Sequence, residues 1–266
     1  MAATAPHAAG APVLRGDNDG ITTLTLSRPE RYNVLSHETI GALSAALAAI
    51  AMDGRTRVVV IGSTGKAFCT GHDLREMREH HDEAFLRRLL GDCSQLMQAI
   101  VALPQPVIAK VQGIATAAGC QLVASCDLAI AAHSARFATS GINYGLFCAT
   151  PAVALSRTVA RKHALEMLFT GDFIDAETAE RIGLVNHAVA DDALDAAADA
   201  LARKIAAKSA YATRLGKASF YRQANQPLDA AYRCASVDLV NNLLADDGLE
   251  GLNAFVEKRT PRFDGT

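Results

Sequence analysis

The chain has 266 residues, 50% of them apolar, and a formal net charge of -2. This length suffices for one large domain with a substantial core, and the near-neutral charge gives no basis for a nucleic-acid or membrane-surface partner. The six cysteines are scattered without CxxC pairs, which favours reduced thiols in a cytoplasmic protein over a disulfide framework or a zinc site.

The first part of the chain is expected to fold from residue 13 onward. Residues 1–12 are rich in alanine and proline, which predicts a disordered tail. Apolar and hydroxyl side chains alternate over 21–26, as in a half-buried strand, and the preceding residues have hairpin-turn chemistry. Apolar residues at helical spacing over 37–52 predict a helix with Ser36 as its N-cap.

Strands and helices then alternate. A strand is predicted over 57–62, a helix opened by Asp73, an amphipathic helix over 86–103 and a strand over 107–111. Such alternation is typical of strand–helix–strand crossovers. The sequence therefore predicts an α/β fold with a largely parallel sheet.

Two glycine turns are candidate binding elements. The small residues 115–119 follow a strand and precede a short helix, whose first turn would present the backbone N–H groups of Ala118 and Gly119 as donors for an anion or oxyanion. The alternative is that small residues only permit tight helix–sheet packing. Because 67–74 is a second strand–glycine–helix turn, the two turns could converge on one carbonyl oxygen.

The second half of the chain is predicted to be mostly helical. Residues 137–156 lack charge but contain glycine, proline and hydroxyl residues, which favours a buried irregular segment over a membrane span. One further strand is predicted over 185–189. A composition change near 205–210 divides a core, 13–205, from a C-terminal helical region, 206–266, of the kind that covers a neighbouring subunit. Helices are predicted over 164–169, 176–182, 194–207, 211–223, 229–244 and 248–258.

Four segments, in order and spacing, resemble the motifs of the crotonase family, also called the enoyl-CoA hydratase/isomerase superfamily. They are residues 26–35, 67–74, 109–127 and 168–172. The resemblance covers nearly the whole chain from about residue 13. It implies a spiral of ββα units with a C-terminal helical region, assembly into a homotrimer or a dimer of trimers, and a substrate that is an acyl-CoA or enoyl-CoA thioester.

The resemblance also implies roles for individual residues. The backbone N–H groups of His72 and Ala118, with Gly119 beside the latter, correspond to the oxyanion hole that holds the thioester oxygen. Coenzyme A would enter as part of the substrate, with no covalently bound cofactor and no metal. The implied coenzyme A contacts are Thr70, Asp73, Leu74 and Arg75 within the chain, and Lys258 with Arg259 at the phosphates of a neighbouring copy.

The sequence departs from the family at the two positions that matter for hydration. Hydratases of this family use two glutamates as acid and base, and Gln121 and Gly141 stand in their places here. Neither can take or give a proton in that role, and losing such a group costs about 10²–10⁴-fold. The standard hydratase or isomerase reaction is therefore in doubt.

Several substitutes for the missing glutamates remain open. Space beside Gly141 could admit a bicarbonate as base, held by Thr139, Ser140 and Gln121. Tyr144 or Cys148 could act as acid or nucleophile, although a buried cysteine usually only packs. The ring of His72 is the third candidate. The alternative from another class is a catalytically silent acyl-CoA-binding pseudoenzyme or interaction protein.

Overall fold

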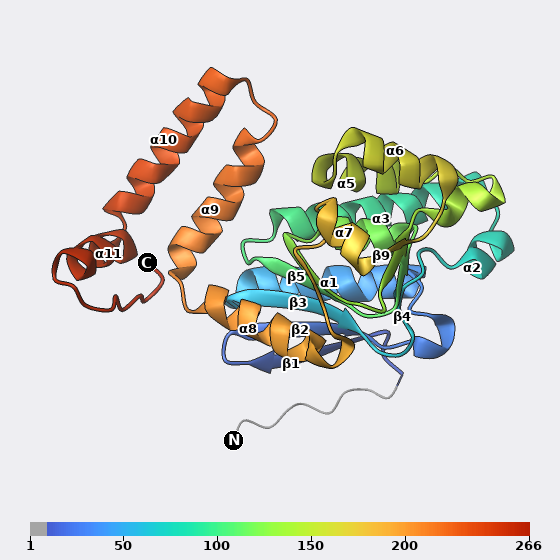
Figure 1. The fold of residues 1–266 in the computed structure, drawn as a ribbon, viewed down its shortest axis with the longest axis horizontal. Helices are drawn as coiled ribbons and strands as arrows, with labels where there is room; N and C mark the ends of the chain where they lie inside the picture. The colour runs from blue at the N-terminus through green and yellow to red at the C-terminus, as the bar shows by residue number, and fades with distance from the viewer. Residues whose placement is uncertain (1–9) are drawn as a thin grey trace.

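The computed structural model describes residues 10–266, which form two sheets, surrounding helices and a helical arm at the C-terminus (Figure 1). Residues 1–9 of the predicted tail lie outside the described part. Within 10–12, the Pro12 carbonyl accepts a hydrogen bond from the Ser27 N–H at 3.0 Å, so the ordered chain begins before residue 13.

The larger sheet has six strands in the order β1-β2-β3-β5-β7-β10. The first two strands form an antiparallel hairpin and all other neighbours are parallel, which confirms the predicted largely parallel sheet. The strands are β1 (Val13–Asn18), β2 (Ile21–Leu26), β3 (Val58–Ser63), β5 (Val107–Val111), β7 (Leu128–Ala132) and β10 (His187–Val189).

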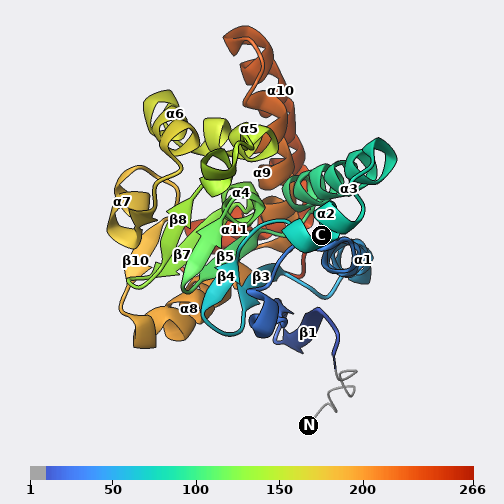
Figure 2. The same ribbon diagram turned by 90° about the vertical axis from the view of Figure 1, so that its right-hand side faces the viewer.

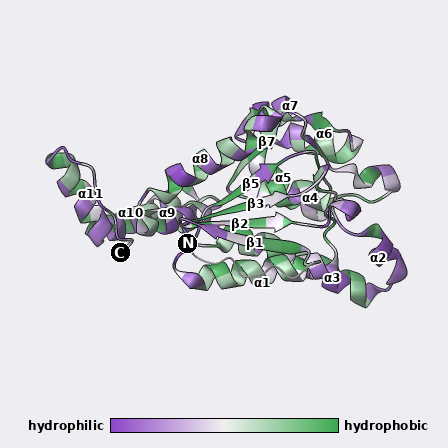
Figure 3. Ribbon diagram, turned by 90° about the horizontal axis from the view of Figure 1, so that it is seen from below, coloured by the Kyte–Doolittle hydropathy of each residue, from purple (hydrophilic) through white to green (hydrophobic). Residues whose placement is uncertain are grey.

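Both faces of this sheet are covered by helices. Alternate residues of β3 point to opposite faces, so Val59 and Ile61 join the main core with α1 (His37–Asp53) and α3 (Glu83–Ala102). Val58 and Val60 pack instead against α8 (Leu194–Ala206). Figure 2 shows α8 and α4 on opposite sides of the strands, and Figure 3 shows the central strands as hydrophobic. Burial on both faces explains the continuous apolar runs.

The smaller sheet has the order β4-β6-β8-β9. Strands β4, β6 and β8 each follow a strand of the larger sheet and precede one or two helices, which confirms the spiral of ββα units. The strands are β4 (Ala67–Cys69), β6 (Ile114–Thr116), β8 (Arg136–Ala138) and β9 (Ile174–Asp175). The helices are α2 (Leu74–Glu79), α4 (Ala118–Ser125), α5 (Ala149–Thr158), α6 (Arg161–Thr170) and α7 (Ala176–Arg181).

The prediction of a buried irregular segment over 137–156 is wrong. The segment contains the end of β8, a 3₁₀ helix, η2 (Ser140–Tyr144), and most of α5, and it exposes 73% of Tyr144 and 52% of Leu146. Its proline and glycine act at element boundaries, because Pro151 lies in the first turn of α5 and Gly145 ends η2 with φ +74°.

The C-terminal arm projects away from the core (Figure 1). It consists of α9 (Ala210–Gln223), α10 (Leu228–Leu244) and α11 (Asp246–Val256). One buried ion pair fastens it, since the Lys217 Nζ donates to Asp127 Oδ2 at 2.6 Å and to the carbonyls of Ile100 and Gln105. The Tyr221 hydroxyl donates to the other oxygen of Asp127 at 2.8 Å.

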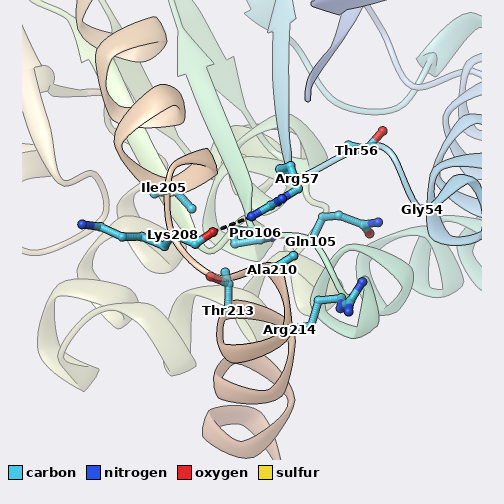
Figure 4. Close-up of a pocket in the computed structure, with 10 residues that line it drawn as sticks. All are labelled: Gly54, Thr56, Arg57, Gln105, Pro106, Ile205, Lys208, Ala210, Thr213 and Arg214. Carbon is cyan, nitrogen blue, oxygen red and sulfur yellow. Dashed lines mark hydrogen bonds between the residues drawn. The ribbon is translucent and has the colours of Figure 1, made fainter. Parts of the chain in front are cut away.

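The junction between α8 and α9 is a second point of attachment. Figure 4 shows the Arg57 guanidinium donating to the carbonyl oxygen of Lys208, beside a cavity of about 10 Å³ that could hold about one water molecule. Within residues 10–266, no helix combines the length and apolar composition required to cross a bilayer.

Candidate functional site

The two glycine turns lie side by side because their strands pair. Strand β4 is parallel to β6, with Cys69 opposite Ala115, so the turn after each strand emerges at the same edge. Gly71 has φ +87°, and a Cβ placed on it would lie 3.1 Å from the Ala118 nitrogen. Only glycine permits both that backbone conformation and this close approach.

The two turns present backbone donors without acceptors. Among residues 10–266, neither the His72 N–H nor the Ala118 N–H has a hydrogen-bond acceptor. Ala118 is the first residue of α4, and Ala117 before it offers no side-chain cap. Ala117 has φ +51° and ψ -120°, a conformation that costs about 1–3 kcal/mol in a residue other than glycine. Its N–H donates to the Ala138 carbonyl at 3.0 Å, which holds it there.

Both donors line a cleft of about 750 Å³. Of the residues selected from the sequence, ten line it: Thr70, His72, Asp73, Leu74, Arg75, Ala118, Ser140, Gly141, Tyr144 and Cys148. Gly119 does not, because a side chain there would overlap the Cys69 carbonyl, so at this position the tight-packing interpretation applies. Gln121 and Lys258 do not line the cleft either.

The charged residues of the cleft come from one part of the chain. Its ionised side chains, Glu30, Arg31, Asp73 and Arg75, all come from residues 30–75. The lining residues beyond position 75 carry no charged side chain: Met77, Leu90, Ile114, Thr116, Ala117, Ala118, Ser140, Gly141, Asn143, Tyr144, Leu146, Phe147, Cys148, Ala149, Thr150, Pro151 and Phe173. The polarity of the cleft therefore suits a ligand with an anionic part and an uncharged part.

Asp73 and its neighbours form the charged rim. The Asp73 side chain is 5% exposed, caps α2 by accepting from the Arg75 N–H at 3.0 Å, and pairs with the Arg31 guanidinium. Arg75 has no ion-pair partner among residues 10–266 and stays available to a ligand. The sequence pattern did not single out Arg31, although it lies within the family segment 26–35.

The His72 ring is held close to the chain rather than free in the cleft. Its Nδ1 lies 3.3 Å from the Leu35 carbonyl oxygen, and its Nε2 is buried without a partner among the described residues. Burial lowers the pKa of His72. The ring is thus neutral near pH 7, with a backbone contact on one nitrogen.

Gln121 lies on α4 and is 4% exposed. Its Oε1 has no hydrogen-bond partner among residues 10–266, an uncommon state for a buried amide. As placed, the Gln121 side chain is not part of the cleft lining.

The space that a side chain at Gly141 would take is already filled. A Cβ there would lie 2.5 Å from the Leu146 carbonyl oxygen and 2.9 Å from the Cys148 sulfur. A side chain at position 141 would therefore require this loop to move, and the bicarbonate site beside Gly141 stays a prediction. Of its expected ligands, Thr139 donates to the Met167 carbonyl and Ser140 shares a hydrogen bond with Thr116.

The other candidate acid or nucleophile groups differ in accessibility. Cys148 lines the cleft but is 8% exposed. Burial raises the pKa of its thiol, and this effect outweighs a hydrogen bond from the Gly141 N–H, which lowers the pKa. Tyr144 is largely exposed at the rim. Within residues 10–266, no three side chains of metal-binding type cluster together.

The C-terminal basic residues do not reach this cleft within one chain. Lys258 follows α11, which Figure 1 shows at the opposite end of the molecule from α2. Arg259 is already paired with Glu250 at 2.6 Å and with Glu257. A role for Lys258 at a cleft therefore requires a second copy of the chain.

Comparisons with known proteins agree with the fold and the motifs. The sequence profile described as enoyl-CoA hydratase/isomerase matches residues 16–266. The mitochondrial enoyl-CoA hydratase domain-containing protein 3 of Rattus norvegicus is 46% identical over 248 residues, which cover 91% of this chain and 81% of that protein.

Two solved structures are also similar. A crystal structure of human enoyl-CoA hydratase domain-containing protein 3 is 44% identical, with a TM-score of 0.93 over 95% of this chain and 100% of that chain. An enoyl-CoA hydratase from Mycobacterium smegmatis is 50% identical, with a TM-score of 0.93 over 95% of this chain and 98% of that chain.

These comparisons also correct one expectation. The cytoplasmic location inferred from the cysteines is contradicted, since the rat, mouse and human relatives are named as mitochondrial proteins. Reduced cysteines do not distinguish the cytoplasm from other reducing compartments, which explains the error. The profile match and the relatives together show that the chain belongs to the enoyl-CoA hydratase/isomerase, or crotonase, family.

Proposed function

We propose that the chain binds an acyl-CoA thioester in the 750 Å³ cleft, with the thioester oxygen accepting from the His72 and Ala118 N–H groups. The observation that carries this proposal is the pair of adjacent backbone donors without acceptors. Fixed donors of this kind stabilise negative charge on oxygen, so they favour the enolate of the bound thioester.

The polarity of the cleft supports one orientation of this ligand. The phosphates of coenzyme A would lie towards Arg31 and Arg75 on the charged rim, near Thr70 and Leu74. The acyl group would then lie against the uncharged lining residues beyond position 75, where an unpaired carboxylate would lose its hydration without compensation. We therefore expect thioesters with uncharged acyl groups to bind best.

The proton transfers of the reaction are a separate matter. Glu30 and Asp73 are the carboxylates that line the cleft among residues 10–266, and Asp73 is committed to Arg31 and to α2. Hydration by two glutamates is thus not the chemistry that we assign. The lack of an uncommitted acid–base pair favours, as the second candidate, a catalytically silent protein that binds acyl-CoA.

A substitution at Ala118 tests the binding proposal. Proline is favoured at the first position of a helix, so Ala118→Pro removes the N–H and leaves α4 intact, at the cost of restricting the already strained Ala117 before it. We expect it to weaken binding of acetoacetyl-CoA, which forms an enolate, by about 10²–10³-fold. Binding of an S-alkyl coenzyme A thioether, which lacks the carbonyl oxygen, should not change. Equal affinity of the unaltered protein for both ligands would overturn the proposal.

Turnover separates the two candidate functions. A mass-spectrometric assay with a panel of enoyl- and acyl-CoA thioesters, with and without bicarbonate, would identify any reaction. Conversion of one thioester would eliminate the silent-binder candidate, and a dependence on bicarbonate would identify an external base. Tight binding without conversion of any member would leave binding as the function.

We also propose that the arm mediates assembly into a homotrimer or a dimer of trimers. Its helices expose large apolar side chains, including 79% of Leu244 on α10 and 84% of Phe255 on α11. Exposed apolar surface on this scale is typical of an interface. In such an assembly, Lys258 of one copy could approach the coenzyme A phosphates of another.

A further inference from the structure

Asn33 is a buried side chain next to the cleft that has had no role so far. It is 1% exposed and lies between the 3₁₀ helix η1 (Pro29–Arg31) and α1. Its Nδ2 donates to the carbonyls of Thr64 and Ala67, both at 2.8 Å, and its Oδ1 accepts from the Arg28 N–H at 2.9 Å. Both amide protons of Asn33 are therefore used.

The backbone at this position restricts which residues fit. Asn33 has φ +54° and Tyr32 beside it has φ +53°. Asparagine adopts this left-handed region more readily than most residues, and glycine adopts it freely. Only asparagine combines this conformation with two N–H donors and one acceptor on a short side chain.

The contacts of Asn33 lead directly to one of the two donor turns. Ala67, which accepts from Asn33, is the first residue of β4, and β4 runs into Gly71 and His72. Two residues after Asn33, the Leu35 N–H donates to the Gly71 carbonyl at 2.8 Å. The segment 33–35 thus makes two contacts here. Its Asn33 side chain contacts the start of β4, and its Leu35 N–H contacts the donor turn that follows β4.

We propose that Asn33 is a positioning residue that sets where the His72 N–H lies relative to the Ala118 N–H. The proposal rests on the proposed function, because it assigns a task to donors that hold a thioester oxygen. When Asn33 is replaced, the Thr64 carbonyl loses its side-chain donor, the Ala67 carbonyl retains the Ser63 hydroxyl at 3.2 Å, and the segment 33–35 shifts. A misplacement of about 1 Å at such a site costs up to about 10²-fold.

The test measures how strongly the protein prefers a carbonyl. We define the preference as the dissociation constant of an S-alkyl coenzyme A thioether divided by that of acetoacetyl-CoA. Asn33→Gly keeps the left-handed backbone and removes only the side-chain bonds, and we expect it to lower the preference by about tenfold. Absorbance of the bound enolate should fall in parallel.

A matched control removes buried hydrogen bonds away from the cleft. Thr22 is 1% exposed on β2 and bonds to Asp17 at 2.6 Å and to Thr56 at 2.8 Å. Thr22→Val should leave the preference unchanged while lowering stability. An unchanged preference in Asn33→Gly, or an equal loss in Thr22→Val, would overturn the proposal.

A second variant keeps the proposal testable if Asn33→Gly does not fold. Asn33→Asp has nearly the same shape, but its ionised carboxylate faces two carbonyl oxygens. Protonation supplies one O–H donor, so the preference of Asn33→Asp should recover as the pH is lowered. An Asn33→Asp variant without this recovery contradicts the role of the side-chain donor.

Two failures can be distinguished. If the unaltered protein shows no preference, the proposed function fails. A preference that survives in the variants refutes only the role of Asn33.

Discussion

Glycine at position 141 does not create a vacancy in this protein. The Leu146 carbonyl and the Cys148 sulfur occupy the direction in which a side chain would extend, and the Leu146 N–H donates back to the Gly141 carbonyl at 3.0 Å. The loop from 141 to 148 is thus built around glycine. Restoring a family glutamate there would require the loop to move, so a single substitution is not a simple reversal.

The first prediction concerns this close packing. We expect Gly141→Ala to lower the free energy of unfolding by about 1–3 kcal/mol, because its Cβ would overlap the Leu146 carbonyl. Gly91→Ala is the matched control, since a Cβ at Gly91 meets no atom within 4 Å and the helix α3 favours alanine. Urea unfolding of both variants checks the difference. Equal stability of Gly141→Ala and the unaltered protein would show that the loop adapts freely.

Residues that act through local motifs could be predicted, whereas residues that act through distant contacts could not. The donors at His72 and Ala118 lie in turns that the sequence motifs mark. Asn33 and Arg31 have partners 31 to 42 positions away along the chain, at Thr64, Ala67 and Asp73. No local pattern indicates those partners. The assigned roles of His72, Ala118 and the coenzyme A residues stay predictions.

Among the elements, long periodic segments were predicted well and short ones were missed. The helix α1 begins after Ser36, whose hydroxyl accepts from the Thr39 N–H as expected of an N-cap. Strands β4, β6 and β8 have three residues each and no alternation to detect. Their pairing arises only when successive ββα units stack, so the smaller sheet is a product of tertiary structure.

The second prediction concerns the link between α1 and the first hairpin. Burial opposes ionisation of Asp53, but hydrogen bonds from Thr56 and Arg15 outweigh it and lower the pKa of Asp53 to about 2 from 3.8. The resulting stabilisation is present above the unfolded-state pKa and is lost as the pH falls through about 2. Asp53→Asn should therefore show a flatter decline of stability between about pH 4 and pH 2. Parallel declines in urea unfolding would contradict this assignment.

At the scale of the whole molecule, the apolar surface of the arm is the feature that the monomer leaves unexplained. On α10, Val237, Val240 and Leu244 recur at helical spacing and expose 60%, 52% and 79% of their surface. Our proposal is that a second copy of the chain covers this face. The boundary expected near residue 205 coincides with the end of α8, but its role in trimerisation stays a prediction.

The third prediction tests assembly through this face. Val240→Glu combined with Leu244→Glu should dissociate the oligomer without unfolding the core, because a buried carboxylate at an interface loses its hydration. Sedimentation velocity should show a single species near 28.0 kDa for the variant and a larger one for the unaltered protein. The control is Met52→Glu, since Met52 is 86% exposed on the distant helix α1. A monomeric unaltered protein would contradict the assembly.

The buried pair of Lys217 and Asp127 has a consequence for how the molecule opens. The Lys217 side chain is 7% exposed and provides much of the attachment of α9 to the core. Arm and core can therefore unfold as separate cooperative units with different free energies of opening. In native-state hydrogen exchange, amides of α10 and α11 should exchange together through partial unfolding, while α4 and β5 exchange only when the whole domain unfolds. Acyl-CoA bound in the cleft would slow hydrogen exchange of the α4 amides. In a dissociated chain, it would leave the exchange rates of the arm amides unchanged.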